Sequence, residues 1–485
     1  MVDETVSILV VDVGTSGVRA AVVQDDASVT HAHHREVLPQ SPAQGFVEFD
    51  AGLMADAVLA VARSALAAGG PVAAVGIANQ RASTIVWDRS TGEPVAPGIG
   101  WQDLRTVGMC LMLRSEGIRL APNQSATKLA MLLDLADPRR EGDLCFGTVD
   151  SWVAWVLSGG RLHVTDHTNA GVTGLVTLDG TQWDLELCEK LRIPESVLPS
   201  LVCSSGALGE ASALDDAPVI AGIAGDQQAS LVGQGCLGPG TAKATFGTGG
   251  MLDCCVGGAR PEFPQRGTAG TFPIVAWSRG GELTWGLEAV MLSAGSCVEW
   301  LRDDLGVVAS AAETDEIAAS VADSGGAYFV PALLGLGTPL WDFGARGTLV
   351  GITRGTTRAQ IVRAVLEGVA YRGADLLEAV VADSGLEIET LKVDGGMSAN
   401  STFVQALADA TGRPIEVAPV TEATTLGAGF LAGTGVGTWS SLDEASALVH
   451  PRRVVQPARR PDRARWLEAR SRAERTVPEL STLDF

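Results

Sequence analysis

The sequence predicts an α/β protein built from two domains of similar size. At 485 residues the chain exceeds the length at which one hydrophobic core usually stops growing, so two cores are expected. Strand-like and helical segments alternate, most clearly in the second half. Each half also contains two apolar strands joined by a turn rich in Gly and Thr, at residues 7–23 and 241–256. This repeated hairpin indicates an internal duplication, and we expect domains at 1–235 and 236–485.

Composition argues against several classes of partner. The formal net charge of -22 would repel nucleic acid and an anionic membrane surface, so neither is expected as a partner. No apolar run reaches the roughly 18 residues needed to span a bilayer. The eight cysteines lack metal-ligand spacing and suit a reducing cytosol better than a disulfide framework. We therefore expect a cytoplasmic protein.

The two hairpins are suited to binding phosphate. In the first, the turn Gly-Thr-Ser-Gly allows main-chain amides to approach phosphate oxygens, and Asp12 at the strand end is placed to hold Mg²⁺ through water. The second hairpin repeats the pattern of strand, Gly-Thr turn and strand. One such turn in each half would place a nucleotide between the two domains. Taken alone, each turn could also be an ordinary hairpin.

Asp226 lies in the segment G-I-A-G-D-Q-Q, residues 222–228, just before the second hairpin. The stretch from Gln227 to Gln234 is expected to open a short helix. A carboxylate near a phosphate-binding turn can accept the proton of a hydroxyl that attacks phosphorus, so this segment is a candidate phosphoryl-transfer centre. Asp226 as a simple helix cap is the competing interpretation. No Walker or Rossmann fingerprint is present, so those nucleotide-binding classes are not favoured.

Two polar or aromatic positions follow the buried strand expected within residues 72–87. Arg81 ends this strand in the cluster Asn-Gln-Arg and can donate a fork of hydrogen bonds into a cleft, although a surface position is also common for Arg. Trp101 can offer a flat face to the carbon side of a polyol, or can simply pack in the core.

Helical periodicity predicts three longer helices. We expect them from Leu111 to Leu135, from Glu288 to Leu305 and from Thr357 to Ala382. Gly396 belongs to a double glycine that opens a further helix, where the phosphates or the ribose of a nucleotide can rest.

Six motifs, in this order, resemble the FGGY carbohydrate kinases, and within them the glycerol kinases. They are D-V-G-T-S-G-V-R (12–19), N-Q-R (79–81), G-D-Q-Q (225–228), G-T-G (247–249), G-T-L-V-G-I with Q-I-V-R-A-V-L-E (347–367) and D-G-G-M-S-A-N (394–400). The resemblance implies two actin-like (ribonuclease H-like) domains with ATP and Mg²⁺ in the interdomain cleft. It also implies transfer of the γ-phosphoryl group to a terminal polyol hydroxyl, domain closure during catalysis, and a dimer or tetramer.

The resemblance gives roles to the positions that match these motifs. Asp226 resembles the general base and, with Asp12, a neighbour of the metal. The positions expected to bind the polyol are Arg81, Ala82, Trp101, Asn123, Asp226, Gln227 and Met251. The positions expected to bind ATP are Thr15, Ser16, Arg19, Thr248, Gly295, Gly396 and Asn400.

At three of the expected polyol-binding positions, the residue in this chain differs from the residue in the glycerol kinases. Ala82 stands where they have Glu, Asn123 where they have Tyr, and Met251 where they have an aromatic residue. A lost carboxylate leaves substrate hydroxyls unpaired at about 1–3 kcal/mol each, and Asn adds room, so we expect a polyol of about four or five carbons. The alternatives are a ketose kinase acting on xylulose or ribulose, and a non-catalytic, nucleotide-gated regulatory protein.

Overall fold

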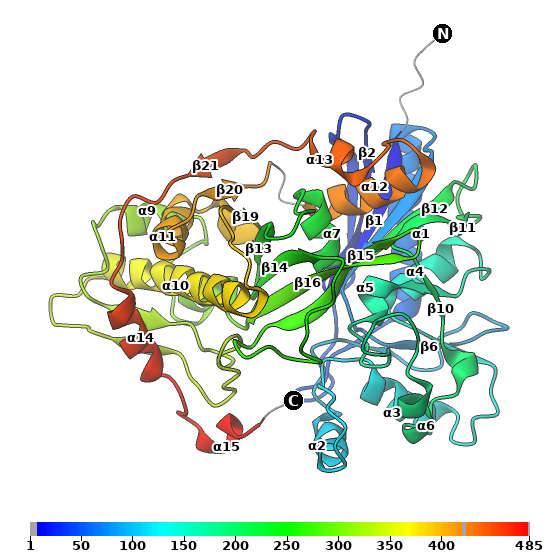
Figure 1. Ribbon diagram of the computed structural model, residues 1–485, viewed down its shortest axis with the longest axis horizontal. Helices are drawn as coiled ribbons and strands as arrows, with labels where there is room; N and C mark the ends of the chain where they lie inside the picture. Colours follow the sequence, from blue (N-terminus) through cyan, green and yellow to red (C-terminus); the bar gives the residue numbers. More distant parts are fainter. Residues whose placement is uncertain (1–6, 420–422, 484–485) are drawn as a thin grey trace, which may run out of the picture.

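The computed structural model describes residues 7–419 and 423–483. One sheet of 13 strands runs through the molecule, and four pairs of short strands accompany it (Figure 1). The strands of the large sheet are β1 (Ile8–Val13), β2 (Gly17–Val23), β3 (Val29–Glu36), β5 (Ala74–Asn79), β11 (Ser205–Glu210), β12 (Val219–Gly225), β13 (Ala242–Phe246), β14 (Gly250–Gly257), β15 (Phe272–Arg279), β16 (Glu282–Met291), β19 (Leu391–Asp394), β20 (Ile415–Val417) and β21 (Arg453–Val455).

The short strand pairs join segments around this sheet. They are β4 (Glu48–Phe49) with β7 (Gly98–Ile99), β6 (Ile85–Asp88) with β8 (Leu144–Gly147), β9 (Val164–Asp166) with β10 (Ser200–Val202), and β17 (Tyr328–Val330) with β18 (Thr348–Val350). The helices are α1 (Ala51–Gly69), α2 (Val107–Ser115), α3 (Ala126–Ala136), α4 (Val149–Leu157), α5 (His167–Ala170), α6 (Leu185–Lys190), α7 (Asp226–Gly233), α8 (Gly295–Glu299), α9 (Glu313–Ala319), α10 (Arg358–Ser384), α11 (Ser401–Thr411), α12 (Ala423–Val436), α13 (Leu442–Ser446), α14 (Arg463–Ser471) and α15 (Pro478–Ser481).

The large sheet contains one strand arrangement twice. In the first half of the chain, β1 pairs antiparallel with β2 and parallel with β5, and β5 pairs parallel with β12. In the second half, β13 pairs antiparallel with β14 and parallel with β19, and β19 pairs parallel with β20. The two half-sheets join where β11 meets β15, at Ser205 and Arg279. This repeat confirms the predicted internal duplication.

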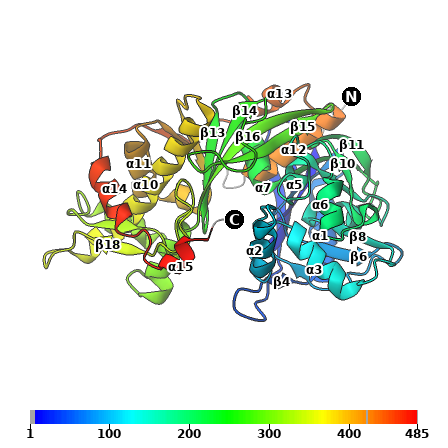
Figure 2. The ribbon, with the colours of Figure 1, turned by 60° about the horizontal axis from the view of Figure 1, so that its bottom comes forward.

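The helices form two groups, one around each half-sheet (Figure 2). Helices α1 to α6 lie with the first half, and α9, α10, α11 and α14 lie with the second. Helix α12 comes from the second half of the chain, yet it packs against α7, β12, β5 and β1. Its Ala428, Phe430 and Leu431 share a buried cluster with Ile8 and Val10. The second half therefore completes the core of the first, and the boundary at 235/236 stays a prediction.

Local sequence explains the ends of the longest helix, α10. Thr357 and Gln360 form a capping box at its start, which satisfies amide groups that the first turn leaves without partners. Gly385 ends it in the left-handed conformation, with φ 67°, where a residue with a side chain would be strained. The predicted helix from Thr357 to Ala382 is confirmed to within two residues at each end.

Helix α1 is apolar enough, by length and composition, to cross a membrane. Asp56 and Arg63 interrupt it, however, and Arg63 donates a hydrogen bond to the carbonyl of Ala213 at 3.0 Å. Its buried face packs against β1, β2, β3 and α4. This helix accordingly covers one face of the first half-sheet.

Two predicted helices are wrong in extent. The segment from Leu111 to Leu135 contains α2 and α3, and the chain breaks between them at Gly117, which has φ 86°, and at Pro122. The first residues of the predicted helix from Glu288 are instead the end of strand β16, which runs to Met291, and helical structure begins only with the five-residue α8 and the π-helical turn, Trp300–Asp304. Both faces of strand β16 are buried over most of its length, so its sequence lacks the alternation of apolar and polar residues that indicates a strand.

Candidate active site

Three parallel strands of the first half end at the same edge of the sheet. β1, β5 and β12 are neighbours, and Asp12, Ala78 and Ala224 lie in one row across them. Beyond this row the chain continues into the turn at 14–16, into Arg81, and into Asp226 at the start of α7. Ligands of open α/β sheets bind outside the carboxyl ends of parallel strands. The fold thus brings three predicted site segments to one place.

Arg81 is buried between two carboxylates. Its Nη2 lies 2.6 Å from Oε2 of Glu288, and its Nε lies 3.5 Å from Oδ1 of Asp226. Nη2 also lies 3.7 Å from Sδ of Met251. Burial lowers the pKa of the guanidinium, but the charges of the two carboxylates outweigh burial and raise it. Nη1 is buried and has no hydrogen-bond partner among the described residues, so it is a donor available to a ligand oxygen.

Asp226 begins α7 with a carboxylate that is about one-third exposed (34%). The amide of Gln227 donates a hydrogen bond to its Oδ1 at 2.8 Å. Burial raises the pKa of Asp226, while the charge of Arg81 opposes this shift. A carboxylate with a raised pKa that still reaches solvent is better suited than an ordinary surface acid to accept a proton.

Sequence reasoning missed three buried charged residues behind Arg81. Glu288 lies opposite Asp253 on β14, and Asp253 lies opposite Lys243 on β13. Nζ of Lys243 lies 2.7 Å from Oδ2 of Asp253 and 2.5 Å from Oε1 of Gln227. The pKa of Glu288 is raised to about 7, mainly by burial. The charge of Arg81 opposes this rise, and the charge of Asp253 adds to it. The available signal was a charged residue in the interior of each of three largely apolar strands.

Trp101 lies beside the turn of the first hairpin. Its Nε1 donates to Oγ1 of Thr15 at 3.3 Å, and its backbone amide donates to Oγ of Ser83 at 3.1 Å. The fully buried Lys128 of α3 donates to the carbonyls of Trp101 at 3.2 Å and Asn123 at 3.4 Å. Burial lowers the pKa of Lys128 to about 7. The structure therefore places the predicted polyol positions Trp101 and Asn123 around one buried amine.

Ala82 follows Arg81 in a left-handed conformation, with φ 60°. Its carbonyl accepts a hydrogen bond from Oγ of Ser125 at 3.0 Å, and the residue is 5% exposed. Positive φ is uncommon for a residue with a Cβ, and such positions concentrate at functional sites. The side chain of Ala82 brings no polar atom to the site. The carboxylate that lies closest to Arg81 is that of Glu288.

The turn of the second hairpin, 247–249, is bonded to the start of α8. The amide of Gly295 donates to the carbonyl of Gly247 at 2.8 Å, and the amide of Ser296 donates to the carbonyl of Thr248 at 3.1 Å. A Cβ on Gly295 would lie 2.6 Å from the oxygen of Gly247. The close approach of the two backbones therefore requires glycine at 295.

The double glycine lies against the same hairpin. Gly395 has φ 83°, and a Cβ there would lie 2.5 Å from the carbonyl oxygen of Phe246, next to the turn. A 3₁₀ turn, Gly396–Ala399, follows, and Asn400 then caps α11 with its side chain. The side chain of Asn400 also donates to Oγ1 of Thr314 at 3.0 Å. Thr248, Gly295 and Gly396 are thus brought together, whereas the Asn400 side chain is engaged in local structure.

The remaining predicted positions lie on the first hairpin. Asp12 on β1 is paired in register with Arg19 on β2, and Ser16 is exposed in the turn between the strands. Within the described part of the chain, no cluster of three or more His, Cys, Asp or Glu residues could hold a metal ion. Any metal site at Asp12 and Asp226 therefore has at most two carboxylates.

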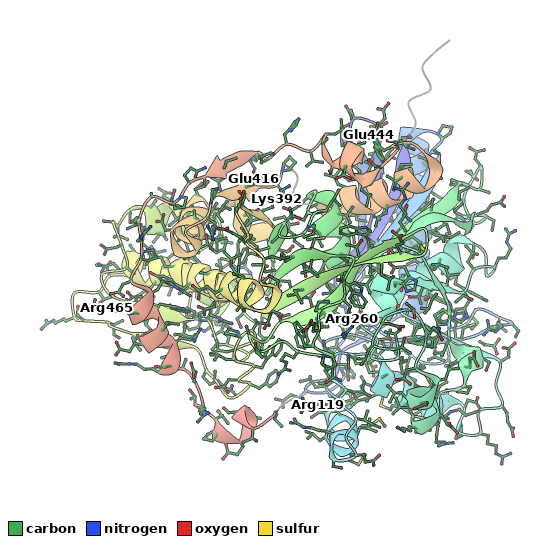
Figure 3. All side chains as sticks on the ribbon, in the orientation of Figure 1. Arg119, Arg260, Lys392, Glu416, Glu444 and Arg465 are labelled. Atoms are coloured by element: carbon green, nitrogen blue, oxygen red, sulfur yellow. The ribbon has the colours of Figure 1, made fainter. Side chains whose placement is uncertain are left out.

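Helix α7 connects the two halves. It begins with Asp226, and its Ser230 donates from Oγ to Oδ2 of Asp394 at the end of β19, at 2.8 Å. Lys392 of the same strand, labelled in Figure 3, donates to the carbonyl of Gln234 at 2.6 Å. The helix that carries Asp226 is therefore anchored to the strand that leads into the double glycine.

A surface cavity of about 640 Å³ lies in the second half between α9, α10 and α11, away from Asp226. It is lined by Ala312, Asp315, Glu316, Ala319, Arg363, Ser401, Thr402 and Gln405. The candidate site is defined by the convergence of polar groups at the strand ends, which this cavity does not share.

Two domain models of one family match the chain along most of its length. The N-terminal domain of the FGGY family of carbohydrate kinases matches residues 7–233, and the C-terminal domain matches residues 242–436. The chain belongs to the FGGY family of carbohydrate kinases. Membership in a kinase family implies ATP as the co-substrate of this FGGY kinase.

The chain is similar along nearly its whole length to several kinases. The chain is 43% identical over 476 residues to a glycerol kinase of Dechloromonas aromatica, covering 94% of each protein. A Plasmodium falciparum glycerol kinase solved with ADP superposes with a TM-score of 0.88 at 27% identity, covering 99% of both chains. A xyloylose kinase from Brucella ovis gives 0.84 at 25% identity, covering 99% of this chain and 100% of that one. The predicted actin-like, two-domain fold is confirmed.

Proposed function

We propose that this FGGY kinase transfers the γ-phosphoryl group of ATP to a terminal hydroxyl of a small polyol. The observation that carries this proposal is the pairing of the partly exposed Asp226 carboxylate with Arg81, whose buried Nη1 lacks a partner among the described residues. A polyol can fill both needs, because one hydroxyl can give a proton to Asp226 while another accepts a bond from Arg81. The similarity to glycerol kinases supports a polyol as the acceptor.

Asp226 would act as the general base. As the hydroxyl oxygen forms its bond to the γ-phosphorus, the bond from that phosphorus to the β–γ bridging oxygen breaks, and ADP leaves with the bonding electrons. The hydroxyl proton moves to the Asp226 carboxylate. Arg81 and Gln227 would orient the polyol, and Trp101 would pack against its carbon chain.

The two hairpin turns would hold the phosphates of ATP. Thr15, Ser16 and Thr248 lie on these turns, and Arg19 follows the first of them. Gly295, Gly396 and Asn400 are proposed to line the nucleoside. This division is supported by the backbone contacts that join α8 and the double glycine to the second turn.

We also propose that Mg²⁺ accompanies ATP. Asp12 and Asp226 follow neighbouring parallel strands and offer the carboxylate oxygens that Mg²⁺ prefers, while waters and phosphates would complete its coordination. When bound, the ion would neutralise charge that builds up on the phosphates during transfer.

The side chains at three of the proposed polyol positions support a polyol longer than glycerol. Ala82 offers only a methyl group, Asn123 is exposed beside Trp101, and Met251 contacts Arg81. Comparison of kcat/KM for glycerol, erythritol, threitol and the pentitols tests this proposal. The four- and five-carbon polyols should give higher values than glycerol, and a strong preference for glycerol would refute the longer substrate.

The second candidate is a ketose kinase, which the similarity to a xyloylose kinase favours. Release of ADP, followed with ATP and either a polyol or xylulose or ribulose, separates these candidates. Stimulation by polyols supports our proposal, and stimulation by ketoses alone supports the second candidate. The absence of stimulation by any polyol or ketose would favour a nucleotide-gated regulatory protein and would contradict the proposed substrate class.

We further propose that the enzyme is a cytoplasmic homo-oligomer, a dimer or a tetramer. Its buried free cysteines are compatible with a reducing compartment. Light scattering of the purified protein tests the oligomeric state, and a monomer at micromolar concentration would overturn it.

A further inference from the structure

Lys243 and Asp253 form an ion pair that is completely enclosed by protein. Both side chains have 0% exposed surface, and Nζ of Lys243 lies 2.7 Å from Oδ2 of Asp253. Moving two charges out of water is costly, and a buried ion pair seldom adds more stability than well-packed apolar residues of similar volume. The pair is therefore a poor device for holding β13 and β14 together. The contact of Lys243 with Gln227, a residue of the candidate site, points to another role.

Lys243 fixes the orientation of the Gln227 amide. An ammonium group can only donate hydrogen bonds, so the atom of Gln227 that faces it at 2.5 Å must be the oxygen Oε1. The other terminal atom, Nε2, then points away from Lys243. Nζ also donates a hydrogen bond to Oγ1 of Thr245 at 3.0 Å, and it forms the ion pair with Oδ2 of Asp253 at 2.7 Å. This arrangement keeps the ammonium group from turning away from Gln227.

We propose that Lys243, held in place by Asp253, is a positioning residue that presents Nε2 of Gln227 as a hydrogen-bond donor to a substrate hydroxyl oxygen. The inference rests on the proposed function, in which Gln227 contacts the polyol. With the amide reversed, Oε1 would face the substrate and would compete with Asp226 for hydroxyl protons. With the observed orientation, Gln227 donates and Asp226 accepts, so the reacting hydroxyl is directed to the base.

The same charged residues connect the second polyol donor, Arg81, to this arrangement. Asp253 lies opposite Glu288 across β14 and β16, and Glu288 forms the 2.6 Å ion pair with Arg81. A continuous series of neighbours thus runs from Gln227 through Lys243, Asp253 and Glu288 to Arg81. Both donors that would face the polyol are positioned by one buried set of charges from the second half of the chain.

The test compares two variants, Lys243→Met and Lys243→Met with Asp253→Leu. The single variant leaves Asp253 buried without its partner, so its Tm should fall, and the polyol KM should rise on the order of 10-fold because Gln227 loses its fixed orientation. The double variant removes both charges, so Tm should recover while the polyol KM stays high. The KM for ATP should change less than about 2-fold in both variants.

A purely structural role for the pair predicts a different result. In that case the polyol KM would recover together with Tm in the double variant, and the inference would be overturned. Should Lys243→Met fail to fold, the double variant alone still decides, because normal Tm with a normal polyol KM contradicts the inference.

A mutant cycle with Gln227→Ala localises the effect. Once Gln227 is truncated, adding the Lys243→Met and Asp253→Leu pair should raise the polyol KM by less than about 2-fold, since there is no amide left to orient. A further full increase in KM would contradict the inference. An unmodified enzyme that turns over no polyol would instead overturn the proposed function, so the two failures are distinguishable.

Discussion

The two halves of this FGGY kinase share one strand arrangement but differ in the groups that lie at the ends of the strands. In the first half, the strand ends lead to charged side chains, Arg81 and Asp226. In the second half, the corresponding region consists of backbone, with the turn at 247–249 held against Gly295 and Gly395. A hydroxyl that must lose a proton needs a titratable group, whereas phosphate oxygens need only fixed amide donors. We therefore propose that side chains of the first half handle the proton, whereas the backbone turns of both hairpins bind the phosphates.

Replacement of Asp226, the proposed general base, should have the largest effect on activity. Asp226→Asn keeps the shape of the side chain but removes the proton acceptor, so kcat should fall about 10²- to 10⁴-fold. The KM for ATP should stay within about 2-fold, because the variant leaves unchanged the two turns that are proposed to bind the phosphates. Polyol-dependent ADP release measures both values, and ordinary turnover by the variant would contradict the role of Asp226.

Adding a side chain at Gly295, in the second half, should weaken the binding of ATP. A Cβ on Gly295 would lie 2.6 Å from the carbonyl oxygen of Gly247, so Gly295→Ala must displace the turn at 247–249. We expect the KM for ATP to rise on the order of 10-fold with little change in the polyol KM. Gly108→Ala in α2 is the matched control, since nothing lies within 4 Å of a Cβ there. Equal ATP KM values for both variants would contradict the assignment of this turn.

Glu288 reaches from the second half to Arg81 in the first, and it should make stability depend on pH. Its pKa is raised to about 7 from 4.5, so the folded chain holds this proton more tightly than the unfolded chain. The stabilisation is complete below pH 4.5 and is lost as pH rises through about 7. Arg81 and Asp253 are the charged groups facing it, and neither is altered in Glu288→Gln.

The Glu288→Gln variant lacks this pH-dependent contribution. Its free energy of unfolding, relative to the unmodified protein, should therefore increase between about pH 5 and pH 8 by an amount on the order of 3 kcal/mol or less. Urea unfolding at several pH values measures the difference. A difference that stays constant over this range would contradict the raised pKa.

The smallest effect is expected from Met251, which the second half contributes beside Arg81. Met251→Phe fills space next to the polyol, so kcat/KM for glycerol relative to erythritol should rise by about 3- to 10-fold. The same panel of polyols measures the ratio. An unchanged ratio would show that Met251 does not limit substrate length.

The sequence was sufficient to predict the elements that are local. Both hairpins, the short helix after Asp226, and the long helix from Thr357 depend on turn residues, capping and periodicity within one segment, and the structure confirms them. The break between α2 and α3 was also signalled locally, by Gly117 and Pro122, but helical periodicity on both sides obscured it.

The buried charges behind the site could not be predicted in the same way. Lys243, Asp253 and Glu288 become neighbours only because β13, β14 and β16 lie side by side, and Arg81 joins them from another half-sheet. Each lies in the interior of a largely apolar segment, where composition alone does not reveal a partner. The register of strand pairs supplies the missing information.

A crystal structure with ADP and the polyol of highest kcat/KM tests the central claim most directly. We predict a terminal hydroxyl oxygen within about 2.6–3.2 Å of the Asp226 carboxylate, with other hydroxyls accepting bonds from Nη1 of Arg81 and Nε2 of Gln227. The phosphates of ADP should lie between the turns at 14–16 and 247–249. A polyol bound elsewhere, with the Asp226 carboxylate facing only solvent, would contradict the account.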